Sequence, residues 1–177
     1  SEYGISARGE QRTQLRATPL GQGLLSLARC ALLGEEETTA DDLLRYLRAP
    51  GLLRRPEIAD ALEVEVRRQG LRTVAEARAR TPLELGELDA LAGATDPAGE
   101  LLWQARRLLA APRRNQAALL DVEEQLDARA VAAIASGLAE LDELGLRLSG
   151  SELIEWLETL EVETVIADDS GAVLVTD

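Results

Sequence analysis

The sequence contains no histidine, no lysine and no phenylalanine, and its only cysteine is Cys30. Without histidine the chain has no histidine-based triad or general base, and it lacks the ligands of a cysteine–histidine zinc site. Without lysine it has neither the lysine of a phosphate-binding loop nor a Schiff-base nucleophile. These absences remove most catalytic chemistry, so we expect no enzymatic activity, no cofactor, no metal and no small-molecule substrate.

Cys30 lies inside the apolar stretch LLSLARCALL, which predicts a buried core thiol. A single cysteine cannot form a disulfide within the chain, which fits a reducing compartment. No apolar run approaches the roughly 20 residues that a membrane-spanning helix needs, and no secretory signal is present. We therefore expect a cytoplasmic protein that makes no membrane contact.

Charge is distributed unevenly along the chain. All 19 basic residues are arginines, and the formal net charge is −13. Up to Gln116, 17 arginines balance 17 acids, whereas from Ala117 onward only Arg129 and Arg147 oppose 15 acids. An acidic surface repels a phosphate backbone, so we expect any contact with DNA to come from the region before Gln116.

Hydrophobic spacing and capping residues predict helices through most of residues 18–160. Thr18 is a hydroxyl cap followed by a proline, Asp96 has the same place before another proline, and Ser149 starts a capping box with Glu152. Ser136-Gly137 is a candidate kink and Gly145 a candidate helix end. The predicted helices cover residues 18–33, 39–48, 56–70, 73–80, 82–91, 96–111, 116–148 and 149–160.

The same spacing predicts which side chains face the core, which must be aliphatic because aromatic residues make up only 2% of the chain. Val64 and Val122 fall on the apolar stripes of their predicted helices. Trp103 and Trp156 each lie on a stripe with leucines, so we expect them to be core or interface anchors.

Strand-like sequence is confined to the two ends of the chain. Residues 3–16 predict an extended or irregular lead-in, and residues 163–167 and 172–176 predict two strands around a turn at 168–171. Two strands alone are marginal in water, so we expect the remaining sheet to belong to a larger parent protein.

The resulting fold prediction is a mainly α, multi-helix bundle-like domain with seven to nine helices and a short C-terminal β element. Residues 1–17 are predicted to be an extended lead-in from a parent domain. Residues 18–160 form the predicted helical accessory domain, and residues 161–177 form a β segment that returns to a parent domain.

Four arginine pairs are the strongest remaining signal of a binding surface. Each pair lies at or near a predicted helix end, where guanidinium groups reach phosphates without disturbing a core. The alternative is ordinary surface arginine that pairs with neighbouring acids and complements the helix dipole. The candidate nucleic-acid contacts are Arg54, Arg55, Arg67, Arg68, Arg106, Arg107, Arg113 and Arg114.

Paired carboxylates are the other residue pattern with chemical potential. They occur at residues 35–37, 41–42, 123–124 and 168–169. A two-metal nuclease would need several of them to converge on a cation. Since residues 35–37 lie in a predicted loop and residues 168–169 in a predicted turn, we interpret the clusters as solvated side chains.

Several phrases are similar to those of known helicases. Tyr3-Gly-Ile-Ser6, followed by Pro19-Leu-Gly-Gln-Gly-Leu-Leu25, resembles the second motor domain of UvrD/RecB-like helicases. Residues 41–53 (DDLLRYLRAPGLL) are similar to a segment of AddB-type helicase–nuclease subunits, and Gly171–Asp177 is similar to the strand that leads back to the motor core. Ser6 stands where many relatives carry proline.

The resemblance implies a helical insertion of the second motor domain, within a bacterial ATP-dependent helicase and exonuclease of DNA repair and recombination. Its partners would be the rest of the parent helicase–nuclease and duplex DNA. The chain has no ATP-binding, arginine-finger or PD-(D/E)XK residues, so neither ATPase nor nuclease activity is implied for it. A second hypothesis is a stand-alone helical protein–protein interaction module whose acidic C-terminal face binds a basic partner.

Overall fold

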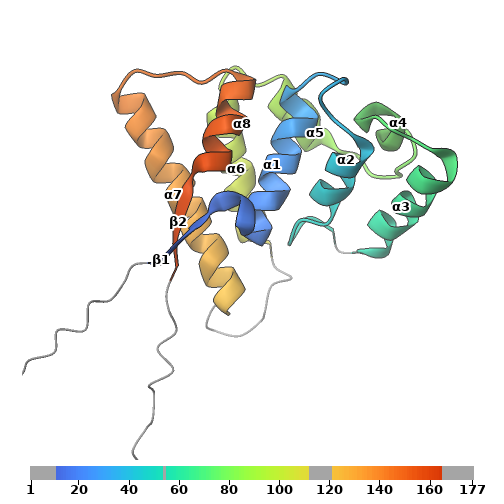
Figure 1. Cartoon of the computed structure of the whole chain (residues 1–177), viewed down its shortest axis with the longest axis horizontal. Helices are drawn as coiled ribbons and strands as arrows, with labels where there is room; N and C mark the ends of the chain where they lie inside the picture. Colours follow the sequence, from blue (N-terminus) through green and yellow to red (C-terminus); the bar gives the residue numbers. More distant parts are fainter. Residues whose placement is uncertain (1–10, 54, 112–120, 165–177) are drawn as a thin grey trace, which may run out of the picture.

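The computed structural model describes residues 11–53, 55–111 and 121–164. These residues contain eight α-helices, one short 3-10 turn and two short strands (Figure 1), so the mainly α prediction is confirmed. In chain order the elements are β1 (Gln11–Gln14), η1 (Leu15–Ala17), α1 (Pro19–Leu32), α2 (Ala40–Leu47), α3 (Glu57–Gln69), α4 (Val74–Arg78), α5 (Gly86–Ala92), α6 (Pro97–Leu109), α7 (Val122–Glu143), α8 (Gly150–Thr159) and β2 (Glu161–Thr164).

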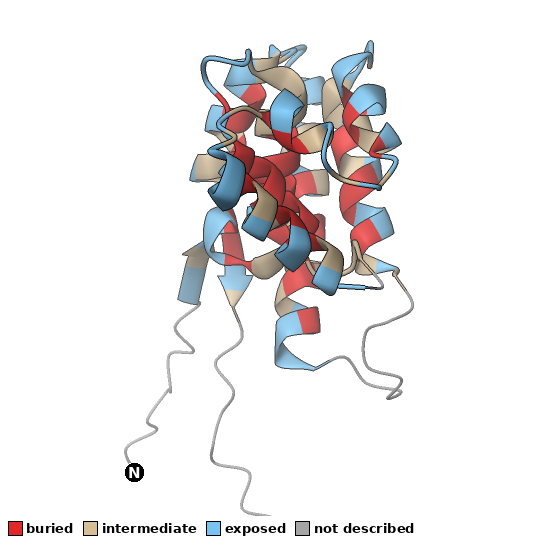
Figure 2. Ribbon diagram, turned by 90° about the vertical axis from the view of Figure 1, so that its right-hand side faces the viewer, coloured by how far each residue is buried: buried red, intermediate tan, exposed pale blue. Residues whose placement is uncertain are grey.

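Helix α1 is the centre of the molecule. It contacts α2, α5, α6, α7, α8 and η1, and eight of its 14 residues are buried. Figure 1 shows α6, α7 and α8 on one side of α1, with α2, α3 and α4 on the other. Figure 2 shows the buried residues concentrated on the inward faces of the helices. The core is aliphatic, as the composition predicts, and Tyr46 is its only fully buried aromatic residue among those described.

The start of α1 is held by both local and distant groups. The Thr18 hydroxyl donates to the Leu15 carbonyl (2.9 Å) and accepts from the Gly21 N–H (3.0 Å), which is the predicted cap. Asp127 of α7, which is 1% exposed, accepts from the Leu20 N–H (3.0 Å). Because a helix N-terminus carries partial positive charge, a carboxylate from a neighbouring helix stabilises it.

Glycine allows the first turn of α1 to approach its surroundings closely. A Cβ atom at position 21 would lie 1.9 Å from the Leu15 carbonyl oxygen, and one at position 23 would lie 2.4 Å from the Ala49 Cβ. Both distances are far below van der Waals contact. Gly21 therefore lets η1 fold against α1, and Gly23 lets the end of α2 pack on it.

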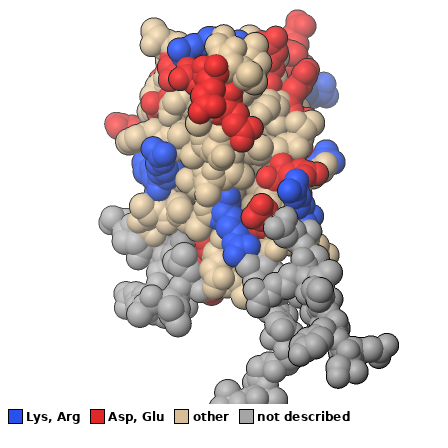
Figure 3. All heavy atoms as spheres, turned by 90° about the vertical axis from the view of Figure 1, so that its left-hand side faces the viewer, with Lys and Arg blue, Asp and Glu red and all other residues tan. Residues whose placement is uncertain are grey.

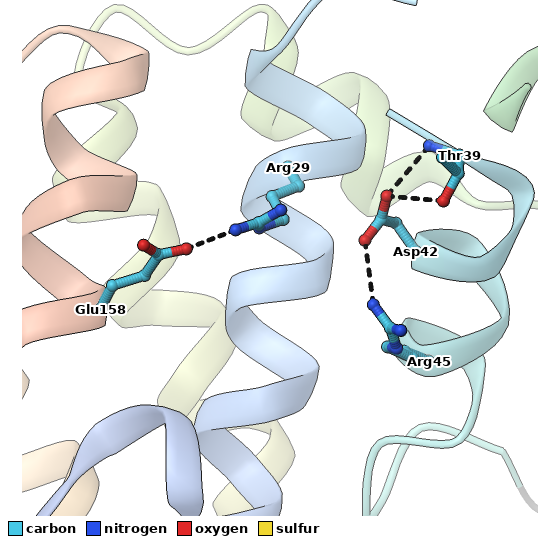
Figure 4. Close-up of polar contacts among 5 residues, drawn as sticks. All are labelled: Arg29, Thr39, Asp42, Arg45 and Glu158. Atoms are coloured by element: carbon cyan, nitrogen blue, oxygen red, sulfur yellow. Dashed lines mark hydrogen bonds and ion pairs between the residues drawn. The ribbon is translucent and has the colours of Figure 1, made fainter. Parts of the chain in front are cut away.

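Figure 4 shows one long-range contact of α1 and a set of local contacts at the start of α2. Arg29 of α1 forms an ion pair with Glu158 of α8. Asp42 of α2 is buried, where one carboxylate oxygen accepts from the Thr39 N–H (2.9 Å) and from the Thr39 hydroxyl (3.0 Å), and the other faces Arg45 (3.5 Å). The short acidic run at 41–42 therefore has a structural role in starting α2.

The two short strands, which come from opposite ends of the described chain, pair with each other. They are antiparallel, with Gln11 opposite Thr164 and Gln14 opposite Glu161. The sequence predicted that a strand at residues 163–167 would pair with residues 172–176, and residues 172–176 lie outside the described residues. The observed partner is part of the predicted extended lead-in, and Val162, fully buried, anchors β2 to the helices.

Two predictions about single side chains are wrong, because Val64 is 62% exposed and Val122 is 74% exposed. Trp103, predicted to be a core or interface anchor, is 56% exposed and does not belong to the core. For α3 the reason is that only one narrow stripe, Ala59, Leu62 and Val66, meets the rest of the protein. Trp156, by contrast, is partly buried against the core and contacts the helix at Gly137.

The prediction that the paired acids are solvated is also wrong in part. Glu124 is buried (5% exposed), as are Asp42 and Asp127, whereas the 35–37 acids are exposed in a loop. In the capping box that starts α7, the Glu124 N–H donates to the Asp121 carboxylate (2.8 Å) and the Glu124 carboxylate accepts from the Asp121 N–H (3.1 Å). Residues 168–169 lie outside the described residues.

Candidate binding site

The arginine pairs predicted to bind DNA lie in different parts of the fold. Arg54, Arg113 and Arg114 lie outside the described residues. Arg55 precedes α3 and pairs with Glu57 (3.0 Å). The remaining two pairs close helices α3 and α6, which Figure 1 shows on opposite sides of α2. The described arginine pairs are therefore not brought together on one surface.

The arginines that end α3 are held by acids of their own helix. Arg67 pairs with Glu63 one turn earlier, and Arg68 pairs with Glu65 (2.7 Å). All of these side chains lie at the surface, where such pairs contribute little to stability. A phosphate would have to compete with a carboxylate for each guanidinium, so α3 fits the surface-arginine alternative better than a dedicated DNA site.

A different arrangement surrounds the arginines of α6. A shallow hollow of about 420 Å³ lies between α5 and α6. It is lined by Gly86, Glu87, Ala90, Glu100, Trp103, Gln104 and Arg107, and we call it the α5–α6 hollow. Its residues come from the first turns of α5 and from one face of α6, because positions 100, 103, 104 and 107 follow the helical repeat.

Trp103 and Arg107 form the exposed wall of the α5–α6 hollow. The Arg107 guanidinium carbon lies 5.8 Å from the centre of the Trp103 ring, within the range of a cation–π contact. The indole is 56% exposed, which is unusual for the largest apolar side chain of the chain. A tryptophan beside an arginine in a depression is typical of binding surfaces.

Tyr46 does not line the hollow, but it holds Glu87, which does. Tyr46 of α2 is fully buried, and its hydroxyl donates to Glu87 Oε1 (2.8 Å). Burial, followed by the negative charge of Glu87, raises the pKa of Tyr46 well above its usual range. The tyrosine therefore remains a hydrogen-bond donor at every physiological pH and holds the Glu87 carboxylate in place.

Gln104 is the most unusual residue of the site. It is 1% exposed, and its Nε2 donates to Glu100 Oε1 (2.8 Å). Within the described part of the chain, its Oε1 is a buried side-chain oxygen with no hydrogen-bond partner. The amide orientation follows from chemistry: the Glu100 carboxylate can only accept, so the nitrogen must face it and the oxygen must point away.

The polar groups of the α5–α6 hollow are mostly acceptors. Glu87, Glu100 and Gln104 Oε1 offer lone pairs, and Arg107 is the one charged donor among the lining residues. Neither Glu87 nor Glu100 takes part in an ion pair within residues 11–53, 55–111 and 121–164, whereas Asp89 on the outer face of α5 pairs with Arg78 (2.5 Å). The hollow therefore suits a ligand that donates hydrogen bonds and carries positive charge.

Sequence reasoning found Arg107 and missed the residues that give its surroundings their character. It expected Trp103 to be a core or interface anchor, and it did not single out Gln104, Glu87 or Tyr46. One signal was available: Gln104 occupies a core position on the stripe of Leu101, Ala105 and Leu108. A polar side chain on an otherwise apolar stripe needs a hydrogen-bond partner, so such a residue is a candidate for a binding site.

The chain matches no protein-family model, no curated protein and no solved structure. The resemblance to helicase–nuclease subunits therefore stays a prediction. Among the described residues no group of three or more cysteine, aspartate or glutamate side chains is placed to hold a metal ion. In the same residues no helix is both long and apolar enough to cross a membrane.

Proposed function

We propose that the chain is a non-catalytic helical accessory domain of a bacterial helicase–nuclease, acting in the cytoplasm to position DNA or a partner subunit. The observation that carries this proposal is the pairing of β1 with β2. Because these strands are antiparallel neighbours, the chain enters and leaves the helical body, residues 15–160, at one place. Domains whose two ends lie close together are the ones that insert into another fold without disrupting it.

The distribution of charge supports a one-sided contact with DNA. Figure 3 shows acidic side chains gathered toward the upper end of the face on the α7 side, with arginines scattered below them. The described part of the acidic third, residues 121–164, contains only Arg129 and Arg147 as basic residues. A duplex would therefore approach the region before residue 112 and avoid the acidic face.

Fluorescence anisotropy with a short labelled duplex tests the DNA half of this proposal. We expect weak binding that falls steeply with salt, and we expect Arg67→Ala/Arg68→Ala to reduce the salt slope by about one unit per lost contact. The matched control is Asp121→Asn/Glu123→Gln, which changes two exposed charges on the acidic side. This control should raise background binding without changing the slope. No binding at low salt would overturn the DNA role.

The α5–α6 hollow favours a second candidate, a protein–protein interaction module. Two observations support it: Trp103 is exposed beside Arg107, and the described arginines of α3 are already engaged by glutamates. Tryptophan and arginine are the residue types that contribute most to protein interfaces. This candidate does not depend on DNA binding, and a domain can serve both roles through different faces.

A further inference from the structure

We propose that the α5–α6 hollow binds an arginine side chain of a protein partner, with Gln104 Oε1 as the acceptor that selects it. This inference deepens the second candidate function by naming the chemistry of the partner. Its test is separate from that of the DNA role, because Arg67 and Arg68, which are changed in the DNA-binding experiment, do not line the hollow.

The first argument is the cost of the unpartnered oxygen. A buried carbonyl without a donor destabilises the fold by about 1–3 kcal/mol, and natural proteins keep few such groups. An apolar residue of similar size would avoid this cost at position 104. A ligand that donates to Gln104 Oε1 would remove this cost in the complex. The free domain would then carry the cost, and the complex would not.

The second argument is the charge of the lining. Two carboxylates, Glu87 and Glu100, line the hollow without an ion-pair partner in the described part of the chain, against the one guanidinium of Arg107. An anionic ligand would face both carboxylates in a partly desolvated site. A cation gains from both of them, and the Tyr46 hydroxyl fixes one of the two in position.

The third argument selects guanidinium over ammonium. A guanidinium is planar, has five donors in a fixed fork, and stacks on aromatic rings, whereas an ammonium is a compact and strongly hydrated point charge. The hollow offers three separated acceptors and the exposed Trp103 ring. Arg107 already lies over this ring, which shows that the ring accepts a guanidinium.

Access to the oxygen requires a small local movement. Gln104 lines the hollow but is only 1% exposed, and its Oε1 is buried. The proposal therefore requires a neighbouring exposed side chain to move, and Trp103, which is more than half exposed, is the one beside it on α6. Binding should therefore change the environment of Trp103 as well as that of Gln104.

The experiment is an NMR titration of the ¹⁵N-labelled full chain with the peptide acetyl-Gly-Arg-Gly-amide. The signals to follow are the Gln104 side-chain amide and the Trp103 indole N–H, the latter assigned with Trp156→Phe. We expect saturable shifts of both signals. The peptide with citrulline in place of arginine, which keeps the planar shape but has no charge, should bind about tenfold more weakly.

Two variants should change the peptide affinity in opposite directions. Gln104→Met removes the acceptor at similar volume, so it should weaken peptide binding about tenfold and raise the thermal midpoint of the free domain. Arg107→Met removes the competing cation and should tighten peptide binding several-fold. If Gln104→Met does not fold, Glu100→Gln tests the same acceptor set and should also weaken binding.

Three outcomes would overturn the proposal. The first is the absence of saturable shifts up to the solubility limit of the peptide. The second is an affinity that Gln104→Met leaves unchanged. The third is saturable binding of inorganic phosphate that is lost in Arg107→Met, which would identify an anion site. Because the DNA test changes Arg67 and Arg68 and the peptide test changes residues that line the hollow, either proposal can fail while the other stands.

Discussion

Helices α1 and α3 have nearly the same length, 14 and 13 residues, and both begin beside a proline, yet they are stabilised in opposite ways. Helix α1 buries eight residues, and its start is closed by Asp127 from a distant helix. Helix α3 buries three residues, and its charged side chains pair within the same helix, with Arg55 just before it or with Arg48 at the end of α2.

The comparison shows where this protein keeps its stability and where it can change. Packing and buried hydrogen bonds hold α1, so substitutions there should act strongly and independently of pH or salt. Surface ion pairs hold the outer side of α3, so substitutions there should have weak effects that depend on both. A helix of the second kind can exchange its carboxylate partners for a ligand at little cost.

The largest expected effect comes from Gly21→Ala. The added Cβ would lie 1.9 Å from the Leu15 carbonyl oxygen, which is backbone and cannot move unless η1 shifts. Alanine gains about 1 kcal/mol of helix propensity, but a clash this close to backbone costs more than about 3 kcal/mol, so we expect a net loss of more than about 2 kcal/mol in urea denaturation. Gly86→Ala is the control, because a Cβ there has no neighbour within 4 Å. Equal stability of the two variants would show that α1 is not closely packed at its start.

The next effect concerns the contact between α7 and α1. Asp127→Ala leaves the Leu20 N–H without its buried acceptor, and a hydrogen bond to a charged group contributes about 1.5–3 kcal/mol. We expect a loss of about 2 kcal/mol in the free energy of unfolding. Asp127→Asn keeps an acceptor oxygen and should lose less than half as much. If Asn and Ala were equally destabilising, the charge and not the hydrogen bond would be the important property.

The helix starts could be predicted because their signals are local. Thr18 before a proline, Asp96 before a proline, and Thr73 three residues before Glu76 each satisfy N–H groups of their own first turn. Helix α5 is a partial exception: it begins at Gly86 and not at residue 82, because the preceding residues form an irregular segment whose last residue, Leu85, is buried in the core. Local patterns cannot foresee such a path.

The site could not be predicted to the same extent because its properties are tertiary. The sequence indicates that Arg107 ends a helix, but not that Tyr46 reaches Glu87 from 41 positions away. Likewise, the run 121–127 predicts an acidic surface, whereas Asp127 is buried because α7 crosses the start of α1. Spacing gives the face of a helix, and only packing determines what that face meets.

The smallest expected effect is a dependence of stability on pH that comes from the surface ion pairs of α3. Hydrogen bonding to Arg48 at the surface lowers the pKa of Glu63 below its usual value of 4.5. Because the unfolded chain then binds more protons than the folded one, the contribution of Glu63 is present above pH 4.5 and is lost as the pH falls through the lower, folded-state pKa. Glu63→Gln should therefore lower the urea midpoint slightly at pH 7, where the ion pair is formed, and have little effect below the folded-state pKa, so that the dependence of the midpoint on pH becomes flatter. Glu36→Gln, in the exposed loop after α1, removes the same charge without breaking an ion pair among the described residues and serves as the control.

High salt should also reduce the contribution of Glu63 to the difference in wild-type stability between pH 7 and pH 4, since exposed pairs are screened. If Glu63→Gln and Glu36→Gln gave the same pH profile, the ion pairs of α3 would contribute nothing measurable, and its arginines would be free to bind phosphate after all.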